Sequence, residues 1–197
     1  MLKLLVLISG SGSNLRALLE ATHNGEFPAE VIAVGADCDA AGLAHADEFD
    51  TSTFVIPPAD FPTREAWGDA LIEAINVFQP DLIVCAGFMR ILPANVVRRF
   101  SPNLINMHPA LLPLYPGAHA VRDALADGAN ETGCSVHVVD EGVDTGPVIR
   151  QVVVPIEVGE SEETLHERIK IVERDLIVAT VRDISLDHIN LQELTRS

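Results

Sequence analysis

The chain is 197 residues long, which suits one α/β domain and leaves little room for a second. Its hydrophobic fraction of 48% is enough for a buried core, and 29 acidic against 13 basic residues give a formal net charge of -16. Such a field repels nucleic acid and anionic membranes, so we expect small-molecule partners, with any anionic ligand held by local N–H groups or single arginines.

The cysteines and the apolar N-terminal stretch bear on the compartment in which the protein works. Cys38, Cys85 and Cys134 are widely spaced and form no C-x-x-C pair, which is typical of reduced thiols in a cytoplasmic protein. The apolar run ending at Ile8 is short, lacks a signal-peptide cleavage site and leads into a Gly/Ser turn, so we interpret it as a buried first strand. No apolar run is long enough to cross a membrane.

Apolar runs and helical spacings alternate through the first half of the chain. Strands are expected where short apolar runs end at Gly, Pro or polar residues, at Leu4–Ile8, Val31–Val34, Thr53–Ile56 and Leu82–Ala86. Helices are expected between them, after Asn14, over Ala40–Phe49, after the capping residue Thr63 and near Pro93–Phe100. This alternation predicts a parallel, doubly wound α/β sheet, in which ligands bind beyond the C-terminal ends of the strands.

The second half adds further strands, a stiff loop and a long helix. We expect strands at Leu104–Met107, Cys134–Val139 and Val148–Pro155, and helices over His119–Ala126 and after the capping residue Ser161. Prolines 109, 113 and 116 stiffen the loop after the first of these strands, and the last dozen residues, which are polar, are expected to fray. No repeat or linker divides the chain, so residues 1–197 are predicted to form a single domain.

The loop Ser9–Asn14 joins a predicted strand to a predicted helix. Its glycines allow close backbone approach, and the free N–H groups at the helix start can bind phosphate. It lacks the Gly-Lys-Ser/Thr of a Walker loop, and Leu15 stands where the dinucleotide fingerprint needs a third glycine. We therefore favour a monophosphate site over the alternative, an ordinary turn between strand and helix.

Asn106 and His108 lie two residues apart at the end of a predicted strand, so their side chains share a face. The amide can donate to a developing oxyanion, and the imidazole can transfer a proton near neutral pH. A structural role for His108 is the alternative. His137 lies inside the alternating run Ser135–Val139, and we interpret it as a hydrogen-bonded core residue and the weaker catalytic candidate.

Charged residues near these positions allow two interpretations each. Asp140, Glu141 and Asp144 fit neither a calcium loop nor a zinc set, so they form a solvated loop or bring a carboxylate to His108. Glu173 lies beside the apolar stripe of the last helix, where its carboxylate could meet a ligand amine or reach solvent, and we favour solvent. Arg64 and Arg90 are expected to pair with acidic residues.

Five segments occur in an order that resembles the phosphoribosylglycinamide formyltransferase family: Ile8–Leu15, Ala86–Leu92, Asn106–Pro113, Tyr115–Gly117 and Asp144–Ile149. The resemblance covers nearly the whole chain. Asn-x-His-Pro and Asp-x-Gly-Pro are shared by the wider folate formyltransferase superfamily, whereas the Ser-Gly-x-Gly-Ser-Asn loop is more specific. The resemblance implies a Rossmann-like, mostly parallel seven-stranded sheet, with a ribonucleotide-binding half at 1–100 and a catalytic and folate-binding half at 101–197.

The resemblance also implies a reaction in de novo purine biosynthesis. The amine of glycinamide ribonucleotide would attack the formyl group of 10-formyltetrahydrofolate, giving formylglycinamide ribonucleotide and tetrahydrofolate. Asn106 would donate to the oxyanion, His108 would act as the acid, and Asp144 would raise the pKa of His108. No metal is expected, and the protein would be a monomer or a homodimer.

Binding residues follow from the same resemblance. Those implied for the ribonucleotide are Gly12, Ser13, Asn14, Lys170, Ile171, Val172 and Glu173. Those implied for the folate are Arg64, Met89, Arg90, Ile91, Leu92, Asn106, Asp140, Glu141, Gly142, Val143 and Asp144. Pterin recognition would depend largely on backbone groups.

Three other functions compete with this one. A methionyl-tRNA formyltransferase would need a second domain, and the negative charge opposes tRNA binding. A 10-formyltetrahydrofolate hydrolase would use water as the acceptor and would not need the phosphate loop. A non-catalytic nucleotide-binding protein would use Ser9–Asn14 but would have no need of Asn106, His108 and Asp144.

Overall fold

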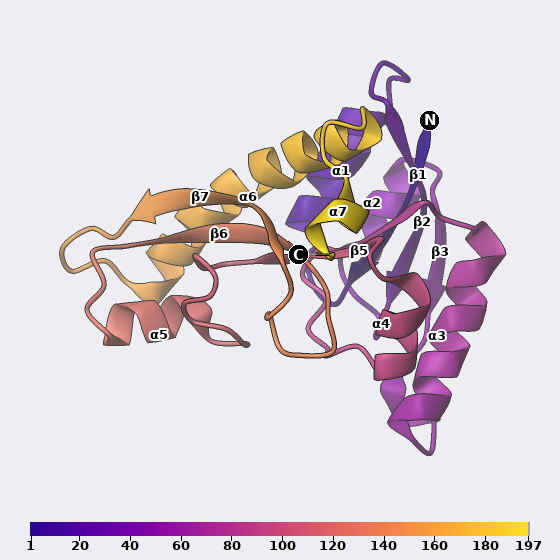
Figure 1. Cartoon of the computed structure of the whole chain (residues 1–197), viewed down its shortest axis with the longest axis horizontal. Coiled ribbons are helices and arrows are strands. Elements are labelled where there is room, and N and C mark those ends of the chain that lie inside the picture. The colour runs from indigo at the N-terminus through magenta and orange to yellow at the C-terminus, as the bar shows by residue number, and fades with distance from the viewer. Residues whose placement is uncertain (197) are drawn as a thin grey trace.

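The strands of the computed structural model, which describes residues 1–196, form a seven-stranded sheet in the order β3-β2-β1-β4-β5-β6-β7 (Figure 1). β1 to β5 pair in parallel, while β6 pairs antiparallel with β5 and with β7. The mostly parallel seven-stranded sheet of the prediction is therefore confirmed. The strands are β1 Leu2–Ile8, β2 Ala29–Ala36, β3 Ser52–Val55, β4 Leu82–Cys85, β5 Leu104–His108, β6 Glu131–Val138 and β7 Val148–Pro155.

Helices cover both faces of this sheet, because the central strands are apolar on both sides. In β1, Leu4, Val6 and Ile8 belong to the core that includes α1 and α6, whereas Leu5 and Leu7 belong to the core that includes α3 and α4. None of the helices within residues 1–196 has the length and apolar character needed to cross a bilayer. The helices are α1 Ser13–Thr22, α2 Leu43–Glu48, the 3-10 helix η1 Pro58–Asp60, α3 Arg64–Phe78, α4 Ala94–Phe100, α5 Ala120–Ala126, α6 Glu162–Ser185 and α7 Leu191–Leu194.

Side-chain caps set the starts of the longer helices, as predicted. Thr63 accepts a hydrogen bond from Ala66 N at α3, and Ser161 accepts one from Thr164 N at α6. Two expectations were wrong. Helix α2 is shorter than Ala40–Phe49, and the last dozen residues contain α7, which Asn190 caps and whose Leu191 is buried.

The strand order reverses between β1 and β4, and the loops leaving these two strands adjoin. Ser9 N donates to Gly87 O at 3.0 Å, and Met89 N donates to Ser9 Oγ at 2.8 Å. Open α/β sheets bind ligands at such switch points. The Gly/Ser loop and the segment Gly87–Arg90 thus meet where the sequence predicted a site.

Candidate active site

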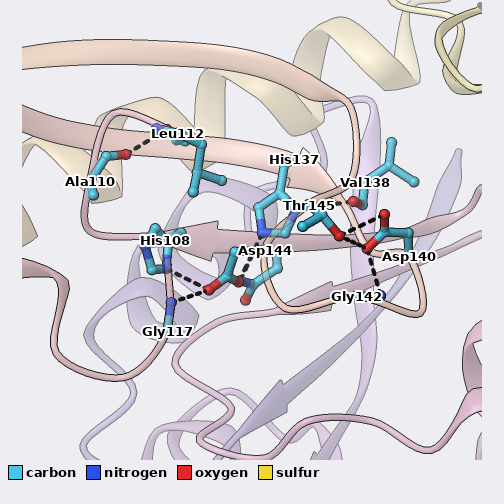
Figure 2. A network of polar contacts seen from close by, with 12 residues as sticks. His108, Ala110, Leu112, Gly117, His137, Val138, Asp140, Gly142, Asp144 and Thr145 are labelled. Atoms are coloured by element: carbon cyan, nitrogen blue, oxygen red, sulfur yellow. Dashed lines mark hydrogen bonds and ion pairs between the residues drawn. The ribbon is translucent and has the colours of Figure 1, made fainter. Parts of the chain in front are cut away.

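Asp144 is the centre of a cluster of polar side chains at the end of β5 (Figure 2). Its Oδ2 accepts a hydrogen bond from Gly117 N at 2.8 Å and lies 3.4 Å from His108 Nδ1. Its Oδ1 accepts a hydrogen bond from Asn106 Nδ2 at 3.4 Å and lies 3.5 Å from His137 Nε2. The structure therefore brings Asn106, His108 and Asp144 together, as the sequence predicted, and adds His137.

The ionisation of Asp144 is strongly favoured. Burial opposes the charged form, but contacts with His137 and the Gly117 N–H, together with the charges of both imidazoles, lower the pKa of Asp144 to about 2. Asp144 has a φ of 54°, in the left-handed region that non-glycine residues seldom adopt. Such strained backbone is typical of functional sites, where surrounding contacts hold it in place.

His108 is almost fully buried, and an acceptor lies near each of its ring nitrogens. Nε2 donates to Tyr115 O at 2.8 Å, since a carbonyl can only accept, and Nδ1 faces the Asp144 carboxylate. Burial nevertheless lowers the pKa of His108, with His137 acting in the same direction, and outweighs the Tyr115 carbonyl and Asp144, which raise it. Asp144 acts on the His108 pKa in the expected direction, but the net shift is downward.

His137, which the sequence predicted as a core residue, also lies in this cluster. Its Nδ1 donates to Val138 O at 3.0 Å, so in the neutral ring Nε2 is free to accept from Asn106 Nδ2 at 3.1 Å. His137 is a buried, hydrogen-bonded residue, as predicted, and it also orients the Asn106 amide. The alternation of Ser135–Val139 gave the face of His137, but only the pairing of Asn106 with His137 across β5 and β6 places it in the site.

A cavity of about 420 Å³ opens beside this cluster. Of the folate positions expected from the sequence, it is lined by Met89, Arg90, Ile91, Leu92, Asn106, Asp140, Gly142, Val143 and Asp144. Arg64 and Glu141 are not in its wall. Arg64 instead donates to Ile91 O at 2.6 Å and so supports the lining segment from behind, while Glu141 pairs with Arg98.

The loop Asp140–Gly146 reaches the cavity by an unexpected route. β6 runs antiparallel to β5, so this loop joins two antiparallel strands and does not leave the C-terminal end of a parallel one. Asp140 accepts hydrogen bonds from Gly142 N and Thr145 Oγ1, and a Cβ on Gly146 would overlap Val138 O. These contacts fold the loop back so that Asp144 meets β5.

The Ser9–Asn14 loop is held by backbone contacts with the start of α2. Gly42 N donates to Gly10 O at 2.9 Å, and His45 Nε2 bonds Ser11 O at 3.1 Å. Gly12, at φ 71°, precedes α1, and a Cβ there would lie 3.1 Å from Gly42 Cα. The glycines thus allow two backbones to approach closely, and the first N–H groups of α1 are left for a ligand.

Glu173 corrects the prediction that this side chain reaches solvent. It is 6% exposed, and its Oε2 accepts a hydrogen bond from Asn14 Nδ2 at 3.2 Å. Burial raises the pKa of Glu173, although Asn14 and the charge of Lys170 act against that shift. Of its neighbours on α6, Lys170 pairs with Glu167 and Ile171 is exposed.

Of the two arginines expected to pair with acids, Arg90 does so, whereas the hydrogen bond of Arg64 goes to the Ile91 carbonyl. Arg90 Nε lies 2.6 Å from Oδ2 of the buried Asp37, at the end of β2. The pair, together with Ser9, links the loops that leave β1, β2 and β4. Within residues 1–196, no group of three or more His, Cys, Asp or Glu side chains is arranged to hold a metal ion.

Comparison with known proteins agrees with this geometry. Residues 2–181 match the formyl transferase family. The chain belongs to this family. It is 50% identical to the phosphoribosylglycinamide formyltransferase of Mycobacterium tuberculosis, over 91% of this chain and 83% of that protein, and 42% identical to that of Escherichia coli, over 86% and 80%. The crystal structure of glycinamide ribonucleotide transformylase 1 from Symbiobacterium toebii superposes with a TM-score of 0.92 at 38% identity, covering 95% of this chain and 89% of the other.

Proposed function

We propose that this formyl transferase moves the formyl group of 10-formyltetrahydrofolate to the amine of glycinamide ribonucleotide, in de novo purine biosynthesis. The observation that carries the proposal is the position of Asp144, between two imidazoles and the Asn106 amide, on the wall of a cavity of about 420 Å³. The names of the relatives support the choice of acceptor.

On the donor side, the cavity has the size and partly apolar lining suited to the pterin of the folate. We propose that backbone groups of Met89–Leu92 and Asp140–Asp144 hold its polar edge, with Asn106 beside its formyl group. Arg64 then acts by holding Ile91 O. The Glu141 side chain pairs with Arg98. Glu141 would therefore contact the folate through its backbone.

On the acceptor side, the phosphate of the ribonucleotide would sit on the N–H groups of Gly12, Ser13 and Asn14, where the dipole of α1 favours an anion. Glu173 would receive polar groups of the ribose or glycinamide, because it is buried and, among residues 1–196, Asn14 is its one hydrogen-bond donor. Lys170 would add positive charge, and Ile171 and Val172 would contribute through the helix that carries them.

The chemical step forms one C–N bond and breaks another. The acceptor amine attacks the formyl carbon, and the carbonyl electron pair moves to oxygen, which accepts from Asn106 Nδ2 in place of the long 3.4 Å contact with Asp144. The amine gives up a proton, through water, as the oxyanion collapses. The bond from the formyl carbon to N10 then breaks, and N10 takes a proton from His108.

Asp144 has two tasks in this step. Its charge stabilises the His108 imidazolium, and its 3.4 Å separation from Nδ1 leaves that proton loosely held and transferable. The Tyr115 carbonyl anchors the opposite nitrogen. Because burial lowers the pKa of His108, its proton is given up readily near neutral pH.

The test is a folate-release assay with purified protein and 10-formyltetrahydrofolate, with and without glycinamide ribonucleotide. Release that depends on the ribonucleotide is expected. Release without it would identify a hydrolase, and absence of release by folded protein would leave a binding protein.

Size-exclusion chromatography in the same buffers will distinguish a monomer from a homodimer. The free thiols of Cys38, Cys85 and Cys134 support a cytoplasmic location.

A further inference from the structure

Gln151 lies on β7 and reaches across β6 to the loop that follows the catalytic strand. Its backbone pairs with that of Ser135 on β6. Its Nε2 donates to Ser135 Oγ at 2.9 Å and to Leu112 O at 2.8 Å, so both hydrogens of the amide are used. The reaction described above gives Gln151 no part.

The Ser135 hydroxyl is the junction of this network. It is fully buried, donates to Ala110 O at 2.5 Å and accepts from Leu112 N at 3.1 Å. With Gln151 as its second donor, the hydroxyl uses its one hydrogen and both lone pairs. Ser135 is buried, whereas Gln151 is exposed at the outer end of the network and supplies two of its hydrogen bonds, one of them to the buried hydroxyl.

The loop fixed in this way holds the catalytic pair at its other end. Ala110 and Leu112 are bound to β6 and β7, and a few residues later Tyr115 O accepts from His108 Nε2. Gly117 N then donates to Asp144 Oδ2 (Figure 2). Tyr115 has a φ of 52°, so its carbonyl is aimed by a left-handed backbone conformation that the neighbouring contacts must maintain.

We propose that Gln151 is a positioning residue for His108, because it fixes the base of the loop whose Tyr115 carbonyl selects and orients the protonated Nε2. This inference rests on the proposed formyl transfer for its catalytic consequence. Its structural consequence, the hydrogen-bonded state of one imidazole, can be observed without any substrate.

Loss of the two donors leaves the Ser135 hydroxyl as the remaining anchor of Ala110 and Leu112. The loop is then held less firmly, and the contact between Tyr115 O and His108 lengthens. The carbonyl raises the pKa of His108 and Asp144 acts likewise, whereas burial and the charge of His137 lower it. Weakening the carbonyl contact therefore moves the titration of His108 to lower pH. It also removes the preference for hydrogen on Nε2 in the neutral ring.

Two variants separate the donors from the bulk of the side chain. Gln151→Glu keeps the size but has no N–H to donate, and Gln151→Ala removes the side chain. Val153→Ala is the matched control, since Val153 lies two residues further along β7 on the same face and is half exposed.

The experiment follows the imidazole nitrogens of ¹⁵N-histidine-labelled, ligand-free protein across a pH titration, with His108→Asn used to assign the signals of His108. We expect a protonated Nε2 in the wild type and in Val153→Ala. In both Gln151 variants we expect mixed tautomers, a titration displaced to lower pH, and a kcat about tenfold lower with the ribonucleotide KM within twofold.

Unchanged His108 signals in both Gln151 variants would overturn the inference, including the case in which only the melting temperature falls. The spectra need no substrate, so the two proposals fail separately. A wild-type protein that transfers no formyl group would overturn the proposed function while leaving the spectral test of Gln151 intact.

Discussion

The proposed phosphate loop follows β1 and the proposed catalytic cluster lies at the end of β5, on the other side of β4, and the two regions are built in opposite ways. The loop Ser9–Asn14 is shaped by backbone contacts and by glycines, at a place where Gly12 nearly touches Gly42. The cluster consists of side chains from three separate segments. The backbone is left-handed at two non-glycine residues, Asp144 and Tyr115, whose carbonyl bonds His108.

The difference follows from the charges that each region must handle. A phosphate carries its charge throughout binding and release, so fixed N–H dipoles are sufficient to hold it, even in a chain of net charge -16. A transferred proton and a transient oxyanion need groups that change protonation or exchange hydrogen bonds. Such groups are side chains, and their orientation must be enforced by neighbours.

The most severe way to break the catalytic cluster is Asp144→Asn. The variant keeps the shape of the side chain but removes the charge that faces His108 and His137. We expect kcat to fall roughly 10⁴-fold, the size of effect seen when the orienting acid of a catalytic imidazole is replaced by its amide. The melting curve should keep its cooperative form.

The measurement is steady-state formyl transfer at neutral pH, with circular dichroism on the same samples. Asp123→Asn, which removes an exposed acid paired with Arg122, is the control and should retain full activity. Turnover within threefold of wild type for Asp144→Asn would show that the Asp144 carboxylate is not needed for formyl transfer, which would contradict the role proposed for it beside His108.

A substitution in the proposed phosphate loop should change a different kinetic parameter, the KM for the ribonucleotide. Gly12→Ala forces a Cβ into the left-handed conformation and to 3.1 Å from Gly42 Cα. Left-handed backbone costs a non-glycine residue roughly 1–2 kcal/mol, so we expect the ribonucleotide KM to rise about tenfold while the folate KM stays unchanged. Gly10→Ala is the matched control, because a Cβ there meets nothing within 4 Å. Equal changes in both KM values would move the phosphate site elsewhere.

Local signals in the sequence were sufficient for most of the fold. Neighbours within a few residues determine the strands, the caps at Thr63 and Ser161, and the shared face from which Asn106 and His108 both reach Asp144. These predictions were confirmed. The short α7 was missed because its cap at Asn190 and one buried side chain, Leu191, stand among polar residues.

The burial of Glu173 was misjudged, and the place of His137 in the site was missed, because both depend on partners far along the chain. Glu173 lies four residues after Ile169 and three before Leu176, so helical spacing allowed it on the buried face, but its carboxylate argued for solvent. Its partner Asn14 is 159 residues away in sequence. His137 required the register of β6 against β5, which no local pattern specifies.

Glu173 is a buried ionisable side chain that contacts Asn14, at the end of the proposed phosphate loop. Burial raises the pKa of Glu173, so the folded protein binds its proton more readily than the unfolded chain does. The stability that this gives below the unfolded pKa is lost as the pH rises through the folded pKa. At neutral pH the buried carboxylate therefore destabilises the fold.

We expect Glu173→Gln to raise the free energy of unfolding at pH 7 by about 1 kcal/mol, with a smaller gain at pH 5, and to raise the ribonucleotide KM. Urea unfolding at both pH values measures the first effect. A variant that is less stable than wild type at pH 7 would show that the carboxylate is stabilised by its surroundings and is not held there for the ligand.

The smallest effect is expected at Arg64, which supports the cavity wall from outside. Arg64→Ala removes the 2.6 Å hydrogen bond to Ile91 O, and the side chain is exposed, so the loss is about 1 kcal/mol or less. The folate KM should rise about threefold while kcat and the ribonucleotide KM hold. Arg122→Ala, which removes an exposed arginine far along the chain, is the control and should change neither KM. A fall of kcat in Arg64→Ala would contradict this prediction. It would mean that a shift of Ile91 in the cavity wall is transmitted to His108.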